Sequence, residues 1–208
     1  FTGALFFAGG DILLVIFAFT LGHVFLVLGA YVSYSPYAHI GAERELIQLM
    51  AVEPMIIIAA IGLYQVNGSF LVGEMANHPG LPILLLPGVF LGFIFILTFK
   101  LRKSPFDLAT SHHAHQELVK GSTTEFSGWT LAMVELAHIY ELVVMLGFIW
   151  LFFGDHLWLC VIAIAAIMFL EILVDNCTSR IKWQDALISA WFVTLVAGAG
   201  NIFALSIM

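Results

Sequence analysis

The sequence predicts an all-α membrane protein, built as a polytopic bundle of about six transmembrane helices. Hydrophobic residues make up 62% of the 208 residues and charged residues only 10%, whereas soluble domains carry about a quarter charged residues. Several apolar runs approach the roughly 20 residues that cross a bilayer core as a helix. The few basic residues lie between these runs, and their scarcity argues against a nucleic-acid-binding protein.

Six spans follow one another in what we expect to be a single membrane domain over residues 1–208. Their expected limits are 10–31, 43–66, 82–99, 129–153, 157–174 and 185–207, and the second begins with an amphipathic run. Residues 33–42 contain a Ser-Pro turn signal and are expected to form a loop. Pro87 lies within the third span and is expected to kink it, because proline cannot donate a backbone hydrogen bond.

Basic residues follow the first, third and fifth spans, and none follows the second or fourth. The three groups are Arg44; Lys100, Arg102, Lys103 and Lys120; and Arg180 and Lys182. By the positive-inside rule these loops face the cytoplasm, so we expect a multi-pass protein of the inner (cytoplasmic) cell membrane. The chain begins with Phe1, without a basic stretch before the first apolar run, so we expect further sequence upstream rather than a signal peptide.

Three ionisable residues at intervals of three occupy the fourth span: Glu135, His138 and Glu141. Residues three apart share a broad face of a helix, so they form a polar strip about 9 Å long. Each costs about 2.5–3.5 kcal/mol at the centre of a membrane helix. The strip is either a proton relay or a set of interhelical hydrogen bonds that hold the bundle together, and the cost of burying ionisable groups favours the relay.

Other ionisable residues within or beside the spans allow two interpretations each. Glu53, just before Pro54, is either a charge that complements a helix N-terminus or a proton donor that faces the bundle. Glu171 and Asp175, four residues apart, fit an interfacial ion-pair group better than a relay. His23 stands alone in its apolar surroundings and is expected to be a hydrogen-bonded core histidine.

The longest polar run, residues 100–128, is expected to be a cytoplasmic interface loop, because a polar loop of this length is uncommon in a helix bundle. It contains a histidine cluster, His112, His113 and His115, followed by Glu117. Their spacing matches no recognised zinc pattern, and two cysteines are too few for an iron–sulfur cluster. We therefore expect no metal and no redox cofactor in this chain.

Three short motifs in this run resemble a known family. They are SPFDL at 104–108, ELV at 117–119 with Gly121, and EFSG at 125–128. They are similar, in order, to the large loop of the membrane-arm connecting subunit of respiratory complex I, which joins the membrane arm to the peripheral arm. The segments SPYAHIGAER and DNCTSRIKWQDALISAW also look like segments of that family. The family has about eight spans, so the resemblance implies two more before Phe1.

One departure from complex I is the stretch ATSHHAHQ after SPFDL. Complex I members have a compact acidic run there, which helps to build the quinone cavity. The chain therefore looks more like the homologous membrane subunit of energy-converting [NiFe] hydrogenases, including the Ech type and the hydrogenase of formate hydrogenlyase.

This resemblance implies a subunit that moves protons or sodium ions, links the electron-transfer arm to the membrane arm, and is not catalytic alone. The implied partners are soluble hydrogenase large and small subunits, a ferredoxin-like subunit, an antiporter-like membrane subunit and the lipid bilayer. Iron–sulfur clusters and a nickel–iron site belong to those partners, and the electron source is reduced ferredoxin. The alternatives are the quinone-site subunit of complex I and a structural membrane anchor that conducts nothing.

The resemblance also assigns roles to individual residues. The implied ion path consists of Glu53, Glu117, Glu125, Glu135, His138 and Glu141. Arg44 and Asp107 are expected to order the interface loops, and Leu108 and Leu118 are expected to be apolar anchors for the soluble partners.

Overall fold

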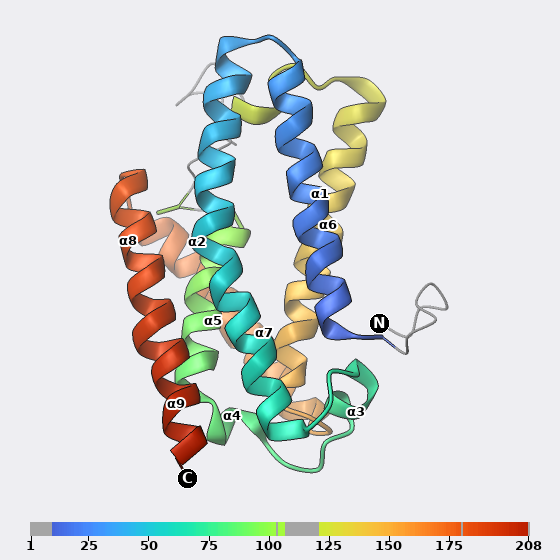
Figure 1. The fold of residues 1–208 in the computed structure, drawn as a ribbon, viewed down its shortest axis with the longest axis vertical. Coiled ribbons are helices and arrows are strands. Elements are labelled where there is room, and N and C mark those ends of the chain that lie inside the picture. The colour runs from blue at the N-terminus through green and yellow to red at the C-terminus, as the bar shows by residue number, and fades with distance from the viewer. Residues whose placement is uncertain (1–9, 103, 107–120, 180, 208) are drawn as a thin grey trace.

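The protein is a bundle of long helices (Figure 1). The computed structural model describes residues 10–102, 104–106, 121–179 and 181–207. In these residues the regular elements are helices, and a single isolated bridge joins Asp11 to Leu71. The predicted all-α fold is therefore confirmed.

The helices follow one another along the chain with short connections. They are α1 (Ile12–Val32), α2 (Pro36–Asn67), α3 (Val72–Ala76), α4 (Pro82–Leu85), α5 (Pro87–Lys100), the 3-10 turn η1 (Gly121–Thr123), α6 (Gly128–Leu151), α7 (Leu157–Cys177), α8 (Trp183–Val193), the π-helical segment η2 (Thr194–Ala199) and α9 (Gly200–Ile207). In the described part of the chain, five stretches are long and apolar enough to cross a membrane: α1, α2, α6, α7 and the continuous run Trp183–Ile207. The protein is thus a multi-pass membrane protein.

The third expected span differs from the prediction, because it is broken and shorter than the others. α4 ends before Leu86, and Pro87 begins a new helix, since its ring cannot continue the hydrogen bonding of the preceding turn. α5 has only 14 residues, a length of about 21 Å at 1.5 Å per residue. It ends at Lys100, well below the upper end of α2 in Figure 1.

The predicted loop at 33–42 is mostly helical. α2 begins at Pro36, because proline is well suited to the first turn of a helix, where its missing N–H is not needed. The connection from α1 is reduced to Ser33, Tyr34 and Ser35. Tyr34 turns the chain with a φ of 55°. With 32 residues, α2 is the longest helix described, and it packs against α1, α5 and α8.

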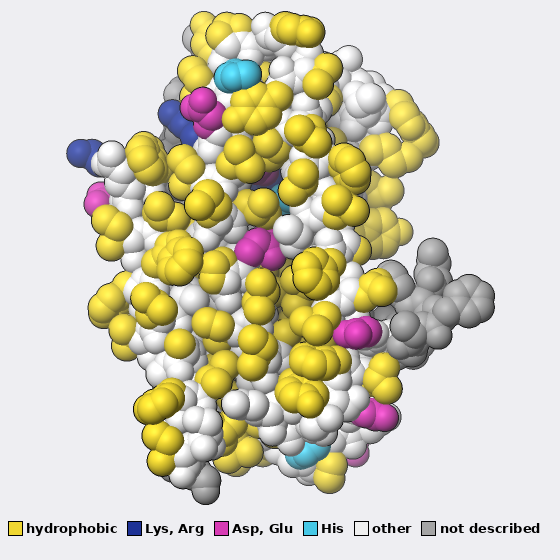
Figure 2. Space-filling view, in the orientation of Figure 1, with side chains coloured by type: hydrophobic (Ala, Val, Ile, Leu, Met, Phe, Trp, Pro, Cys, Tyr) yellow, Lys and Arg dark blue, Asp and Glu magenta, His cyan; other side chains and the backbone are white. Residues whose placement is uncertain are grey.

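The core and the outer surface are both apolar. Phe93, Phe148 and Phe152 are fully buried and form a cluster of rings between α5 and α6. Large hydrophobic side chains such as Phe17 and Phe203 are about two-thirds exposed. Figure 2 shows hydrophobic side chains spread over most of one face, with few charges. Such a surface is suited to lipid rather than water.

The chain that leads into α6 lies directly on α2. A Cβ atom at Gly41 would lie only 2.1 Å from the backbone nitrogen of Ser122, so only glycine permits this approach. On α1, Gly29 lies against the ring of Phe126, which would be 3.1 Å from a Cβ atom there. These contacts fix η1 and the beginning of α6 against the first two helices.

Candidate ion-translocation site

Four ionisable side chains from four different helices meet inside the bundle. They are His23 on α1, Glu53 on α2, Lys100 on α5 and Glu141 on α6, and we call them the charged cluster. The Nζ atom of Lys100 lies 2.7 Å from Oε1 of Glu141 and 3.8 Å from Oε1 of Glu53. Nε2 of His23 lies 3.3 Å from Oε2 of Glu141.

The charged cluster is withdrawn from the surface. The exposed fraction of its side chains ranges from 5% for Glu141 to 15% for Glu53. His23, Glu53 and Glu141 lie near the middle of their helices. Lys100 reaches the same depth because α5 is short. A charge at this depth is costly unless an opposite charge or a hydrogen bond compensates it, and Lys100 supplies that compensation to two carboxylates.

Hydrogen bonds within α1 orient two of the groups around the cluster. Nδ1 of His23 lies 3.0 Å from the carbonyl oxygen of Phe19, one turn earlier. The hydroxyl of Thr20, on the same helix, lies 2.9 Å from Oε2 of Glu53 and 3.0 Å from the carbonyl oxygen of Ile16. α1 therefore presents an imidazole and a hydroxyl to the two carboxylates.

The contact between His23 and Glu141 requires one extra proton. The Phe19 carbonyl oxygen can only accept, so Nδ1 of His23 carries a hydrogen. In the neutral imidazole Nε2 would then be an acceptor, and it would face a second acceptor, the Glu141 carboxylate. A proton on either Nε2 or Oε2 turns this contact into a hydrogen bond. With that proton, the four members of the charged cluster sum to zero charge; without it they sum to −1.

A second ion pair lies beside the charged cluster. Arg102 donates to Glu45, whose side chain is almost fully buried. Between this pair and the charged cluster is a cavity of about 20 Å³, measured as the space for the centre of a water molecule. About 10–15 Å³ of such space holds one water. His23, Lys100 and Glu141 line one part of the cavity, and the Glu45–Arg102 pair lines another.

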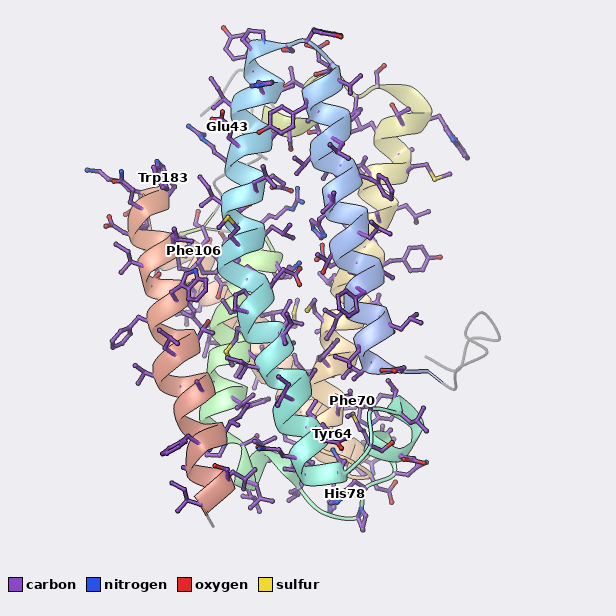
Figure 3. The ribbon with its side chains drawn as sticks, in the orientation of Figure 1. Glu43, Tyr64, Phe70, His78, Phe106 and Trp183 are labelled. Atoms are coloured by element: carbon purple, nitrogen blue, oxygen red, sulfur yellow. The ribbon has the colours of Figure 1, made fainter. Side chains whose placement is uncertain are left out.

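The segment after α5 stays inside the protein. Phe106 is buried and stacks on Phe99 with a ring separation of 3.7 Å. In Figure 3, Phe106 lies well below Glu43, a residue near the beginning of α2. Gln48 of α2 donates to the carbonyl oxygen of Phe106 at 2.7 Å. This packing holds Lys100 and Arg102 beside α2.

The structure separates the three residues of the expected polar strip. Glu141 is buried in the charged cluster, His138 is half-buried, and Glu135 is exposed. The reason is the helical repeat, since six residues turn the helix by 600°, which leaves Glu135 about 120° away from Glu141. Of the expected ion path, only Glu53 and Glu141 come together in the described residues.

The remaining expected site residues lie elsewhere. Glu125 and Arg44 are both exposed. Glu117, Asp107, Leu108 and Leu118 fall outside the described residues, and so does the histidine cluster at 112–115. Glu171 is buried inside the bundle rather than interfacial, and Thr98 donates to it at 3.3 Å. Asp175 accepts from the backbone N–H of Ser104 at 3.0 Å.

Sequence reasoning missed two members of the charged cluster. His23 was expected to stand alone in the core, and Lys100 was expected in a cytoplasmic loop. The length of the third span contains the missing signal. A run of 18 residues interrupted by Pro87 is too short to carry Lys100 out of a bilayer core, so its charge requires partners inside the bundle.

A larger hollow lies between α1 and α6. Its volume is about 550 Å³, measured in the same way, and most of its wall is apolar. Phe25, Phe126 and Met133 contribute to that wall, whereas His23, His138 and Glu141 contribute polar groups. The charged cluster thus borders an apolar space that is large enough for an organic molecule.

Comparison with known proteins identifies the family. Residues 3–206 match the protein family described as NADH dehydrogenase. The chain belongs to this family. The expected resemblance to the membrane-arm connecting subunit of complex I is therefore confirmed, and it covers nearly the whole chain.

Relatives in this family come from more than one kind of complex. Over 147 residues, 67% of this chain, the sequence is 33% identical to hydrogenase-4 component C of Escherichia coli, of which that region is 44%. It is 25% identical over 211 residues to a membrane-arm protein of the NADH-quinone oxidoreductase of Thermomicrobium roseum, which covers 90% of this chain and 61% of that protein. The chain spans about half the length of these relatives.

A solved structure has the same fold. The chain superposes with a TM-score of 0.76 on a chain of the membrane-bound sulfane sulfur reductase, described as an archaeal respiratory membrane complex. The two are 25% identical, and the match covers 93% of this chain and 69% of the other. Members of the NADH dehydrogenase family thus occur in respiratory complexes with different overall chemistries.

Proposed function

We propose that this chain is the ion-translocating membrane subunit of an energy-converting, ferredoxin-dependent [NiFe] hydrogenase. The observation that carries the proposal is the charged cluster, in which His23, Glu53, Lys100 and Glu141 meet near the middle of the bundle. Ionisable groups at that depth are costly, and in membrane proteins they mark ion pathways more often than they serve as structural contacts.

The geometry supports a single-proton step at Glu141. Its Oε2 atom faces His23, and its Oε1 atom accepts from Lys100. A proton can pass between the Glu141 carboxylate and His23, while water in the adjoining cavity connects both groups with the Glu45–Arg102 pair. Loading of the proton makes the cluster neutral, and its release leaves one negative charge that Lys100 stabilises. These two states are what a relay requires.

The hydrogenase assignment is supported by the identity to hydrogenase-4 component C and by the stretch ATSHHAHQ that departs from complex I. In this proposal the iron–sulfur clusters and the nickel–iron site belong to the soluble hydrogenase subunits and to a ferredoxin-like subunit. An antiporter-like membrane subunit continues the ion path, and the basic loops face the cytoplasm. The residues of this chain hold and move the ion.

A second candidate is the quinone-site subunit of complex I. The observation that favours it is the apolar hollow between α1 and α6, whose polar wall includes His138 and Glu141. The relatives from NADH-quinone oxidoreductases agree with it equally well. Purification of the intact complex distinguishes the two candidates. Stoichiometric nickel with no extractable quinone supports the hydrogenase, and bound quinone without nickel supports complex I.

Substitution of Glu141 tests ion translocation itself. Gln at this position keeps the shape and the hydrogen bonding but cannot release a proton. In membrane vesicles that contain the assembled complex, we expect Glu141→Gln to keep electron transfer to the terminal acceptor and to lose the associated ion movement, followed with a potential-sensitive dye. Glu135→Gln is the matched control, because Glu135 is exposed on the same helix. Unchanged ion movement in Glu141→Gln would contradict the proposal.

A further inference from the structure

We infer that Lys100 makes the charged cluster specific for protons by occupying the position that a sodium ion would take. This inference rests on the proposed function, which leaves open whether the transported ion is a proton or sodium. The side chain of Lys100 is 8% exposed, and its ammonium group lies between carboxylates from two other helices.

The oxygen atoms around the ammonium group are those that would bind an alkali cation. Oε1 of Glu141 and Oε1 of Glu53 face Nζ of Lys100, and the hydroxyl of Thr20 lies against the other oxygen of Glu53. Cation sites in membrane proteins are built from carboxylate, carbonyl and hydroxyl oxygens of this kind. In this protein a covalently attached cation already fills the centre of that set.

The charge balance leaves room for one proton and not for a second cation of another kind. Two carboxylates and one ammonium group leave a charge of −1, which resides on the Glu141 side of the cluster. There the nearest group is Nε2 of His23, a nitrogen that pairs with a proton and is a poor ligand for sodium. The adjoining cavity, about 20 Å³, holds about one water and cannot hold a hydrated sodium ion.

Removal of the ammonium group should convert the cluster into a sodium site. Lys100→Met keeps the length and the apolar stem of the side chain, and it leaves the carboxylates of Glu53 and Glu141 without a cation between them. Lys100→Arg is the matched control, because it keeps the positive charge at the position. Lys100→Met combined with Glu53→Gln removes one of the two carboxylates that would bind the ion.

Equilibrium binding of radioactive sodium (²²Na⁺) to the purified, assembled complex measures this conversion. We expect Lys100→Met to bind one more sodium ion per copy of the chain than the wild type. We expect no gain in Lys100→Arg and no gain in the Lys100→Met, Glu53→Gln double variant. Sodium binding by Lys100→Met that equals the wild-type value would overturn the inference.

A comparison within the natural cluster gives a second test that needs no substitution of Lys100, and it decides the matter if Lys100→Met does not assemble. Glu53→Gln should bind as much sodium as the wild type, because the natural cluster binds none. Loss of one bound sodium in Glu53→Gln would show that the natural cluster is a sodium site and would overturn the inference.

These outcomes differ from a failure of the proposed function. If Glu141→Gln loses ion movement and Glu53→Gln loses a bound sodium, the translocating role holds and the proton specificity is wrong. If Glu141→Gln moves ions normally, the translocating role is wrong, while the sodium binding of Lys100→Met still decides whether Lys100 occupies a cation position.

Discussion

His23 has one ring nitrogen on the carbonyl oxygen of Phe19 and the other on Glu141. The first contact fixes which nitrogen carries a permanent hydrogen, and so the second nitrogen becomes the one that exchanges a proton. This division of tasks depends on the turn of α1 that places Phe19 one turn before His23. A residue that composition marks only as polar thus acquires a defined chemical role.

Substitution of His23 tests that role. Because Gln can form hydrogen bonds but cannot gain a proton at neutral pH, we expect His23→Gln to slow proton translocation on the order of 10²-fold, the lower range for loss of a general acid–base group. The complex should still assemble. The measurement is acidification of vesicles with a pH-sensitive dye. His39→Gln is the control, since His39 is exposed on α2 and contacts the ring of Tyr31. Equal rates for the two variants would contradict the role of His23.

The membership of the charged cluster could be predicted only in part. Glu53 and Glu141 stand out because acids are rare in apolar spans, and both belong to it. His23 and Lys100 could not be assigned, because a partner on a different helix depends on packing, which spacing within one span does not reveal. The same limit explains Glu135, whose spacing from Glu141 permits a common face only over three residues and not over six.

At the scale of elements, the short helix α5 decides where the charges lie. Pro87 ends one helix and begins the next, and the 14 residues of α5 then stop inside the bundle. The segment beyond it turns inward, where Phe106 stacks on Phe99 and meets Phe95 edge to face. The kink was predicted from Pro87, but the inward turn depends on the packing of aromatic rings and was not.

Loss of the Phe106 ring should loosen this segment. We expect Phe106→Ala to lower the free energy of unfolding by about 3–5 kcal/mol, the usual cost of deleting a buried aromatic side chain. Phe17→Ala is the matched control, because the ring of Phe17 is 68% exposed and its loss should change the free energy by less than about 0.5 kcal/mol. Unfolding of the purified chain in mixed micelles, followed by tryptophan fluorescence, gives both values.

The contact between α2 and η1 offers a second test at this scale. A methyl group at Gly41 would overlap the backbone of Ser122, so we expect Gly41→Ala to lower the free energy of unfolding by about 1–3 kcal/mol, as overpacking does. At Gly22, which lies within α1, a Cβ atom would meet no other atom within 4 Å, so Gly22→Ala should be neutral or stabilising. If both variants unfold alike in the same assay, the close approach of η1 to α2 is refuted.

At the scale of the whole molecule, the polar interior and the apolar exterior are distributed as a bilayer requires. Composition alone predicted this class and the approximate position of each span. It did not predict that α2 would begin at Pro36 and extend beyond the other helices. That length depends on Pro36 being at a position where proline favours a helix, whereas the Ser-Pro pair also fits a turn.

The two cysteines report on the orientation of the molecule. Cys160 is buried in α7, Cys177 is exposed at its end, and both are free thiols. In sealed vesicles we expect a membrane-impermeant maleimide to label Cys177 only from the cytoplasmic side, because the basic loops are expected there. Cys177→Ser should abolish the labelling, and Cys160→Ser should leave it unchanged. Labelling from the opposite side would reverse the orientation.

The depth of Lys100 also has an electrical consequence. Moving one elementary charge through the whole membrane against 100 mV requires about 2.3 kcal/mol. A proton that arrives at a site halfway across has passed roughly half of that field, which is about 1 kcal/mol per 100 mV, or a change of about sevenfold in occupancy. Membrane voltage therefore helps to set how often the His23–Glu141 pair is loaded. A short fifth helix thus makes the proton occupancy of the protein respond to the voltage that a respiratory complex generates.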